Sequence, residues 1–247
     1  MSDPQRPRPA TAWYDGPPAG VWRDWWVVLH PPYTAWHLGY VLLGAGLAPV
    51  LDGTRLVATL LAFFLAVGVA AHALDELAGR PLGTTIPSRV LAAVAAVALC
   101  GAAALGVAGI GRVGWGLLAF IVVGVVLVVG YNLELWGGRL HHDVVFAAAW
   151  GSFPVLTAYY AQVERLDAAV VSVAAFAFGL SWAQRVLSTE ARSLRRKVSA
   201  VSGYRDYRDG SRQALDTQVL LRPYERALAA LSWATCALGV GLVLTHL

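Results

Sequence analysis

The sequence predicts an all-α integral membrane protein, a bundle of about seven transmembrane helices with its N-terminus in the cytoplasm. Composition is the first reason: 57% of the 247 residues are hydrophobic and 14% are charged, whereas soluble domains carry about 25% charged residues. The second reason is that the apolar residues form long continuous runs, whereas the strands of a membrane barrel would alternate. The third is the uneven distribution of Lys and Arg among the connections.

Residues 1–30 are predicted to be a polar, proline-rich tail that ends in an interfacial segment around Arg23–Trp26. Residues 31–247 are the predicted transmembrane domain. A helix needs about 20 mostly apolar residues to cross a bilayer core. Seven stretches fit, at residues 33–51, 55–74, 88–110, 113–135, 144–163, 168–187 and 226–246. The abundant Gly and Ala in them favour close helix packing in lipid.

The basic residues orient this bundle. The Lys and Arg residues of the first, third and fifth connections between the predicted spans are only Arg55, Arg112 and Arg165. Because Lys and Arg accumulate on the cytoplasmic side, the N-terminus is predicted to be cytoplasmic and the C-terminus external. Residues 188–225 then form a long cytoplasmic loop, whose basic residues contact either lipid headgroups or an anionic substrate. We expect a multi-pass protein of the cell membrane that does not bind nucleic acid.

Polar residues gather at the predicted cytoplasmic ends of the second, fourth, fifth and sixth spans. They are His72, Asp75 and Glu76; Asn132 and Glu134; His141, His142 and Asp143; and Gln184, Arg185 and Glu190. The first three are spaced i, i+3, i+4 and so share one helix face. Helix ends at an interface commonly carry solvated charges, so one such cluster would be ordinary. Several clusters at the same membrane face favour a shared functional site.

The first of these clusters lies in the stretch A-H-A-L-D-E-L-A-G-R-P-L-G-T-T-I-P, residues 71–87. It resembles the first motif of the UbiA superfamily of membrane prenyltransferases, N-D-x-x-D followed by R-P. Asp75 matches the later Asp, and Arg80-Pro81-Leu82 is similar to the residues that follow it. His72 stands where the family has its first Asp, and the family fold has more helices than the seven expected here.

A second stretch, Y-N-L-E-L-W-G-G-R-L-H-H-D-V-V-F-A-A-A-W-G-S-F-P, resembles the family's Tyr-Ser-x-x-Leu-Lys junction and the helix with G-x-x-P after it. Tyr131, Gly151 and Pro154 match in kind, but the Lys is absent. The family's second acidic motif should close the sixth span, where only Glu190 is available.

The resemblance implies transfer or processing of a prenyl diphosphate at a cytoplasm-facing site, with a lipophilic acceptor and Mg²⁺ bridging carboxylates to phosphates. The metal ligands that it implies are Asp75, Glu76 and Glu190. The implied phosphate contacts are Arg80, Arg192 and Arg195, because Arg matches phosphate oxygens bidentately. Tyr131 and Asn132 would line the cavity near the leaving group and, with Asp75, are the candidate catalytic residues.

Two other functions remain open from the sequence. Imidazole suits Fe, Mn or Zn better than Mg²⁺, so His72 also favours a different metal-dependent enzyme that acts on a lipid. Its ligands would come from His72, Asp75, Glu76, Glu134, His141, His142 and Glu190. The third function is that of a non-catalytic membrane subunit that binds lipid. The acceptor, the prenyl chain length and the oligomeric state do not follow from the sequence.

Overall fold

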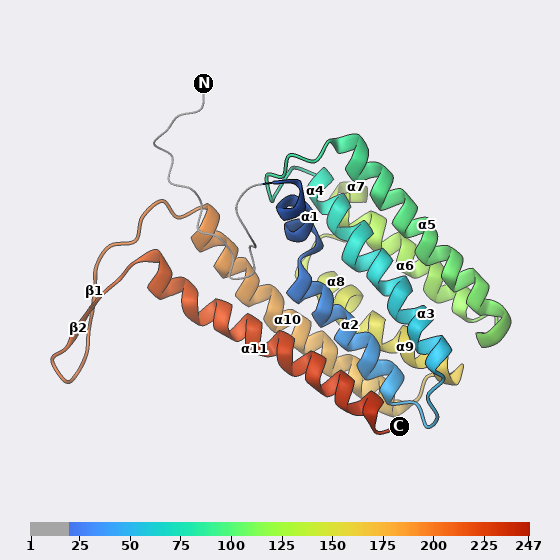
Figure 1. Cartoon of the computed structure of the whole chain (residues 1–247). Coiled ribbons are helices and arrows are strands. Elements are labelled where there is room, and N and C mark those ends of the chain that lie inside the picture. The colour runs from blue at the N-terminus through green and yellow to red at the C-terminus, as the bar shows by residue number, and fades with distance from the viewer. Residues whose placement is uncertain (1–19) are drawn as a thin grey trace.

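The computed structural model describes residues 20–247 and shows a bundle of helices with one small hairpin at its edge (Figure 1). Most of the predicted tail, residues 1–19, lies outside the described part; the remainder contains the first helix. The helices are α1 (Val21–Leu29), α2 (Pro31–Gly46), α3 (Gly53–Phe63), α4 (His72–Leu77), α5 (Ser88–Val113), α6 (Leu117–Asn132), α7 (Leu135–Gly138), α8 (Asp143–Ala147), α9 (Phe153–Val163), α10 (Ala168–Arg196) and α11 (Thr217–Leu244). The hairpin pairs β1 (Tyr204–Asp206) with β2 (Arg212–Ala214) in antiparallel register.

Five helical stretches are long and apolar enough to span a membrane, which supports an all-α, multi-pass membrane protein. They are Gly53–Leu77, Ser88–Val113, Asp143–Val163, Ala168–Arg196 and Thr217–Leu244. The other two predicted spans correspond to α2 and α6, which have 16 residues each and are therefore about 24 Å long. Their length falls short of the roughly 30 Å hydrocarbon core, so the structure supports five of the seven predicted spans by length.

Two of these five stretches contain a π-helical segment, in which the backbone hydrogen bonds join residues five apart, where an α-helix joins residues four apart. Segment η1 (Phe64–Ala71) joins α3 to α4, and segment η2 (Ala148–Ser152) joins α8 to α9. Such segments change the rotation of the residues that follow, and they occur frequently at functional sites. Both lie in the interior of the bundle, where Val67 and Trp150 are buried.

Small residues let the helices of the bundle approach closely. α2 packs against α9 and α11. At Gly44 of α2, an added Cβ would lie 2.2 Å from the carbonyl oxygen of Val155 in α9. The outer surface is apolar as well: Val97, Phe176 and Trp233 are 74%, 53% and 71% exposed, as expected of residues that face lipid.

Helices occupy the two ends of the long cytoplasmic loop predicted at residues 188–225. α10 continues to Arg196 and α11 begins at Thr217, so only residues 197–216, with the hairpin, separate the two helices. The prediction placed the end of the helix at the end of the apolar run. Helix α10 instead continues past the apolar run through charged and small residues. Such residues also form an α-helix where the segment is exposed to water.

Candidate functional site

The polar residues that the sequence analysis singled out surround one end of the bundle, where α1, α4, α7 and the end of α10 meet (Figure 1). A cavity of about 350 Å³ lies there. Its lining is rich in Arg, His, Tyr and amide side chains. The polar and charged lining residues are His30, Tyr33, His37, His72, Asp75, Tyr131, Asn132, Glu134, His141, Gln184, Arg185, Ser188, Arg192, Arg195 and Arg196.

Eight of the twelve site residues predicted from the sequence line this cavity, namely His72, Asp75, Tyr131, Asn132, Glu134, His141, Arg192 and Arg195. They come from α4, α6, the connection between α6 and α8, and α10. The other four, Glu76, Arg80, His142 and Glu190, do not line it. Eight residues predicted from the sequence therefore meet around one cavity at one end of the bundle.

Glu76 has a structural role in place of the predicted metal-binding one. It is fully buried, and its carboxylate accepts hydrogen bonds from the backbone N–H groups of Leu82 and Thr84, at 2.8 and 2.9 Å, and from the Thr84 hydroxyl at 2.8 Å. Three donors satisfy most of the acceptor capacity of a carboxylate. Glu76 thus fixes the connection between α4 and α5, and it does not line the cavity.

Arg80 belongs to the same connection and not to the cavity. Its guanidinium donates to the carbonyl oxygen of Ile86 at 2.5 Å and to the Ser88 hydroxyl at 2.7 Å. Asp24 of α1 supports the connection from the other side by accepting two hydrogen bonds from Thr85. The R-P sequence is therefore part of a connection held by the side chains of Arg80, Glu76 and Asp24.

His142 and Glu190 are exposed to solvent. His142 precedes the first turn of α8 with an extended backbone, so its side chain diverges from that of His141. Glu190 lies on α10 between Arg185 and Arg192 in sequence, but it is on another face of the helix.

The positive charge of the cavity comes from one helix. Arg185, Arg192, Arg195 and Arg196 all line it, and their spacing of 7, 3 and 1 residues places them along one side of the last turns of α10. Two of them have an acidic partner: Arg185 lies 3.0 Å from Asp143, and Arg195 lies 2.8 Å from Glu225. Asp75 and Glu134 are the only carboxylates that line the cavity within residues 20–247, so arginines outnumber carboxylates there.

Buried polar atoms point to a ligand with complementary groups. Tyr131 is 4% exposed and stacks on His141, with ring centroids 4.5 Å apart, while the His141 ring nitrogen lies 3.1 Å from the Tyr131 carbonyl oxygen. The Tyr131 hydroxyl, the Gln184 side-chain oxygen and the Nε of Arg195 are buried and have no hydrogen-bond partner among residues 20–247. Buried polar groups are nearly always paired, so these three atoms are candidates for ligand contacts.

Three lining residues at the start of the chain were missed. His30, Tyr33 and His37 are spaced i, i+3, i+7, so their side chains lie on one face of the corner between α1 and α2. The sequence contains a signal for these residues, a His-Pro-Pro sequence immediately before an apolar run and a second His two turns later. The rings of His30 and His72 are 5.0 Å apart, and the ring of His37 hydrogen-bonds the Trp150 carbonyl oxygen at 2.9 Å.

His30 is a corner residue with a left-handed backbone, φ 43°. Burial, together with the positive charge of His72 and of the α10 arginines, holds the pKa of His30 well below its usual range. The imidazole is therefore neutral at pH 7, and an anion bound near it would favour its protonation.

The described residues do not fit the metal site that the resemblance implies. Among residues 20–247, no group of three or more His, Cys, Asp or Glu side chains is arranged to hold a metal ion. Mg²⁺ prefers several oxygen ligands, and two of the three carboxylates implied as its ligands, Glu76 and Glu190, do not line the cavity. The His-containing set proposed for Fe, Mn or Zn is likewise not assembled, because Glu76, His142 and Glu190 lie elsewhere.

An apolar groove of about 160 Å³ adjoins the polar cavity. It is lined by α3, α5, α6 and α9, with residues such as Ala62, Gly106, Ile121 and Phe153. Two residues, Val67 of η1 and Trp150 of η2, line both spaces. The polar chamber and the apolar groove therefore share a wall at the two π-helical segments.

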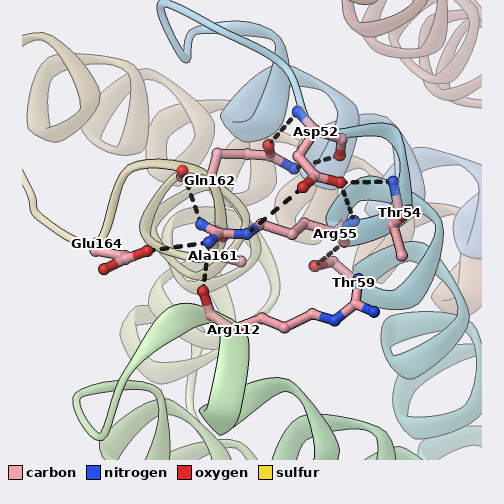
Figure 2. A network of polar contacts seen from close by, with 8 residues as sticks. All are labelled: Asp52, Thr54, Arg55, Thr59, Arg112, Ala161, Gln162 and Glu164. Atoms are coloured by element: carbon pink, nitrogen blue, oxygen red, sulfur yellow. Dashed lines mark hydrogen bonds and ion pairs between the residues drawn. The ribbon is translucent and has the colours of Figure 1, made fainter.

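Several residues of the polar network around Arg55, which Figure 2 shows, line the groove. Arg55 donates to the carbonyl oxygens of Ala161 and Gln162 and pairs with Glu164 at 3.1 Å, and it also donates to the carbonyl oxygen of Arg112. These contacts tie together the start of α3 and the ends of α5 and α9. They satisfy the carbonyl groups that helix ends leave unpaired, so the network has a structural role.

Comparisons of the chain with protein-family models, with curated proteins and with solved structures found no match. The resemblance to the UbiA superfamily therefore rests on the two quoted stretches of sequence.

Proposed function

We propose that this protein is a UbiA-like membrane enzyme that binds a prenyl diphosphate at a cytoplasm-facing site and transfers or processes its isoprenoid group. The observation that carries the proposal is that a chamber rich in Arg and an apolar groove lie side by side, with Val67 and Trp150 lining both. An amphiphile with an anionic head and a long apolar tail matches both spaces at once. In this arrangement α2 and α6 also cross the bilayer, which completes the seven-span bundle.

The head of the lipid is assigned to the chamber. Guanidinium groups bind phosphate oxygens through paired N–H donors, and Arg192 and Arg196 have no acidic partner within residues 20–247. The Tyr131 hydroxyl is a further donor whose position in the chamber would suit a phosphate oxygen. A neutral headgroup would leave these donors and charges uncompensated.

The tail is assigned to the groove, whose lining is almost entirely aliphatic and aromatic. Transfer of apolar surface from water into such a groove is favourable by about 25 cal/mol per Å². The groove also keeps water from a reactive carbon at the junction, where the rings of Tyr131 and Trp150 lie 5.7 Å apart.

The proposed reaction breaks the bond between the allylic carbon and the diphosphate oxygen, and the electron pair leaves with the diphosphate. The α10 arginines stabilise this charge, and the aromatic rings stabilise the allylic cation by cation–π attraction. A lipophilic acceptor supplies the new electron pair and loses a proton. Asp75 and His72 both line the chamber and are the candidate proton acceptors.

Binding and turnover of farnesyl diphosphate by the full chain in lipid nanodiscs test the proposal. We expect saturable binding that Arg192→Gln weakens at least tenfold. Arg89→Gln is the matched control, because Arg89 is exposed at the same end of the bundle but does not line the chamber. Absence of saturable binding in the wild-type protein would refute the proposal.

A non-catalytic protein that binds a lipid phosphate is the second candidate. The observation that favours it is that the Glu76 carboxylate is hydrogen-bonded to the α4–α5 connection. One of the carboxylates implied as metal ligands is therefore not available to the reaction. Tight binding without release of diphosphate, in the presence of a range of lipophilic acceptors, would favour this second function.

A further inference from the structure

We infer that the chamber holds the phosphate groups of its ligand through the guanidinium groups of α10, in place of a bridge of divalent metal ions. The inference rests on the proposed function and specifies how the head of the lipid is recognised.

The chamber has few of the carboxylates that a metal bridge needs. A metal bridge to a diphosphate needs several carboxylate oxygens on the chamber wall, because Mg²⁺ binds phosphates together with protein carboxylates. Asp75 and Glu134 are the carboxylates that line the chamber within residues 20–247. Glu134 has a 64% exposed side chain and lies 3.9 Å from His141, so it faces solvent more than a ligand.

The arginines supply the compensating charge that a metal would otherwise bring. Four guanidinium groups lie within the last twelve residues of α10 and line one chamber. Asp143 and Glu225 compensate two of them, Arg185 and Arg195. Like charges held close together in a partly buried space repel one another, and a polyanion between them relieves that repulsion.

Two buried donors without partners support direct contact with an anion. The Arg195 Nε and the Tyr131 hydroxyl are both buried, both belong to chamber-lining residues, and neither has a hydrogen-bond partner within residues 20–247. A buried donor without a partner destabilises the folded protein, and a phosphate oxygen would satisfy each of them. A metal ion would satisfy neither, since a cation accepts no hydrogen bond.

The test is the affinity of the nanodisc-embedded protein for inorganic pyrophosphate and for farnesyl diphosphate, measured by calorimetry with EDTA and again with excess Mg²⁺. We expect the dissociation constants to agree within about threefold between the two conditions. Arg192→Gln should weaken binding at least tenfold in both, whereas Asp75→Asn should leave it unchanged or strengthen it, because the variant removes a repulsive charge.

Binding that requires Mg²⁺ and is lost in Asp75→Asn would overturn the inference and leave the proposed function intact. Absence of binding under both conditions would overturn both. Arg192→Lys, which retains the charge, is the control for a folding defect in Arg192→Gln. It should bind more tightly than the Gln variant, and equal loss in both variants with unchanged thermal unfolding would count against a guanidinium site.

Discussion

Val67 and Trp150 line both the polar chamber and the apolar groove, and each lies on a π-helical segment. Their side chains come from different spans, Gly53–Leu77 and Asp143–Val163. A π-helical segment shifts the rotation of a helix without ending it, which lets one span line a polar space and an apolar one in succession. The two segments are thus the structural basis of the junction on which the proposed function depends.

A bulky residue at this junction should separate the two parts of the ligand. Val67→Phe is expected to reduce the affinity for farnesyl diphosphate at least tenfold by narrowing the entrance to the groove. The affinity for inorganic pyrophosphate, which has no tail, should change less than twofold. Val97→Phe is the control, because Val97 is 74% exposed on the outer surface of α5. An equal loss for both ligands would contradict the assignment of the groove to the tail.

The connection between α4 and α5 should depend on Glu76. Glu76→Gln replaces an acceptor-only carboxylate by an amide, one side of which cannot accept the hydrogen bonds of Leu82 and Thr84. Hydrogen bonds to a charged group contribute about 1.5–3 kcal/mol each, so we expect a loss of stability of at least about 2 kcal/mol. Thermal unfolding in mild detergent measures it.

Glu190→Gln is the control for this experiment, since Glu190 is exposed on α10 and should tolerate the change. If Glu76→Gln instead retained full stability and lost only ligand binding, Glu76 would belong to the site after all.

The close approach of α2 and α9 predicts a steric effect at Gly44. In Gly44→Ala, the new Cβ would lie 2.2 Å from the Val155 carbonyl oxygen, so the two helices must separate. Overpacking of this kind costs about 1–3 kcal/mol. Gly179→Ala in α10 is the matched control, because no atom lies within 4 Å of a Cβ added there. Unfolding midpoints that agree for the two variants would refute the packing described for α2 and α9.

The buried His30 predicts a loss of stability in weak acid. Because its pKa in the folded state is lowered, the unfolded chain binds more protons once the pH falls below the ordinary pKa of about 6.5. Its contribution is therefore complete above that pH and is lost as the pH falls toward the folded pKa. His30→Asn, which tolerates the left-handed backbone, should flatten the decline of the unfolding midpoint between pH 7.5 and 5. Identical pH profiles for the two proteins would contradict this role.

The sequence predicted the parts of the fold that depend on hydrophobicity, and it failed where local hydrogen bonding decides. Apolar runs predicted the five long helical stretches, and polar residues at the predicted ends of the spans include eight that line the chamber. The spacing of His72, Asp75 and Glu76 placed all three on one side. Glu76 nevertheless does not line the chamber, because backbone donors of the connection between α4 and α5 engage its carboxylate. No sequence pattern reveals such a partner eight residues away.

The groove and the His30 corner could not be found in the same way. The groove is lined by spans that are distant in sequence, so only the packing of the bundle reveals it. The π-helical segments have no distinct periodicity within runs of uniform hydrophobicity such as F-L-A-V-G-V-A-A. By contrast, the spacing of His30 and His37 is visible in the sequence. These residues lie around the predicted start of the first span, outside the polar clusters at the ends of the later spans.

The measurement that tests the central claim most directly is photo-crosslinking of the nanodisc-embedded protein with a farnesyl diphosphate analogue that carries a diazirine at the end of its tail. Mass spectrometry of the labelled peptides should place the label on groove residues of α5, α6 or α9, such as Gly106, Ile121 or Phe153, and excess farnesyl diphosphate should suppress it. Labelling confined to the outer surface around Val97 and Phe176, unaffected by the competitor, would contradict the claim that one lipid occupies both chamber and groove.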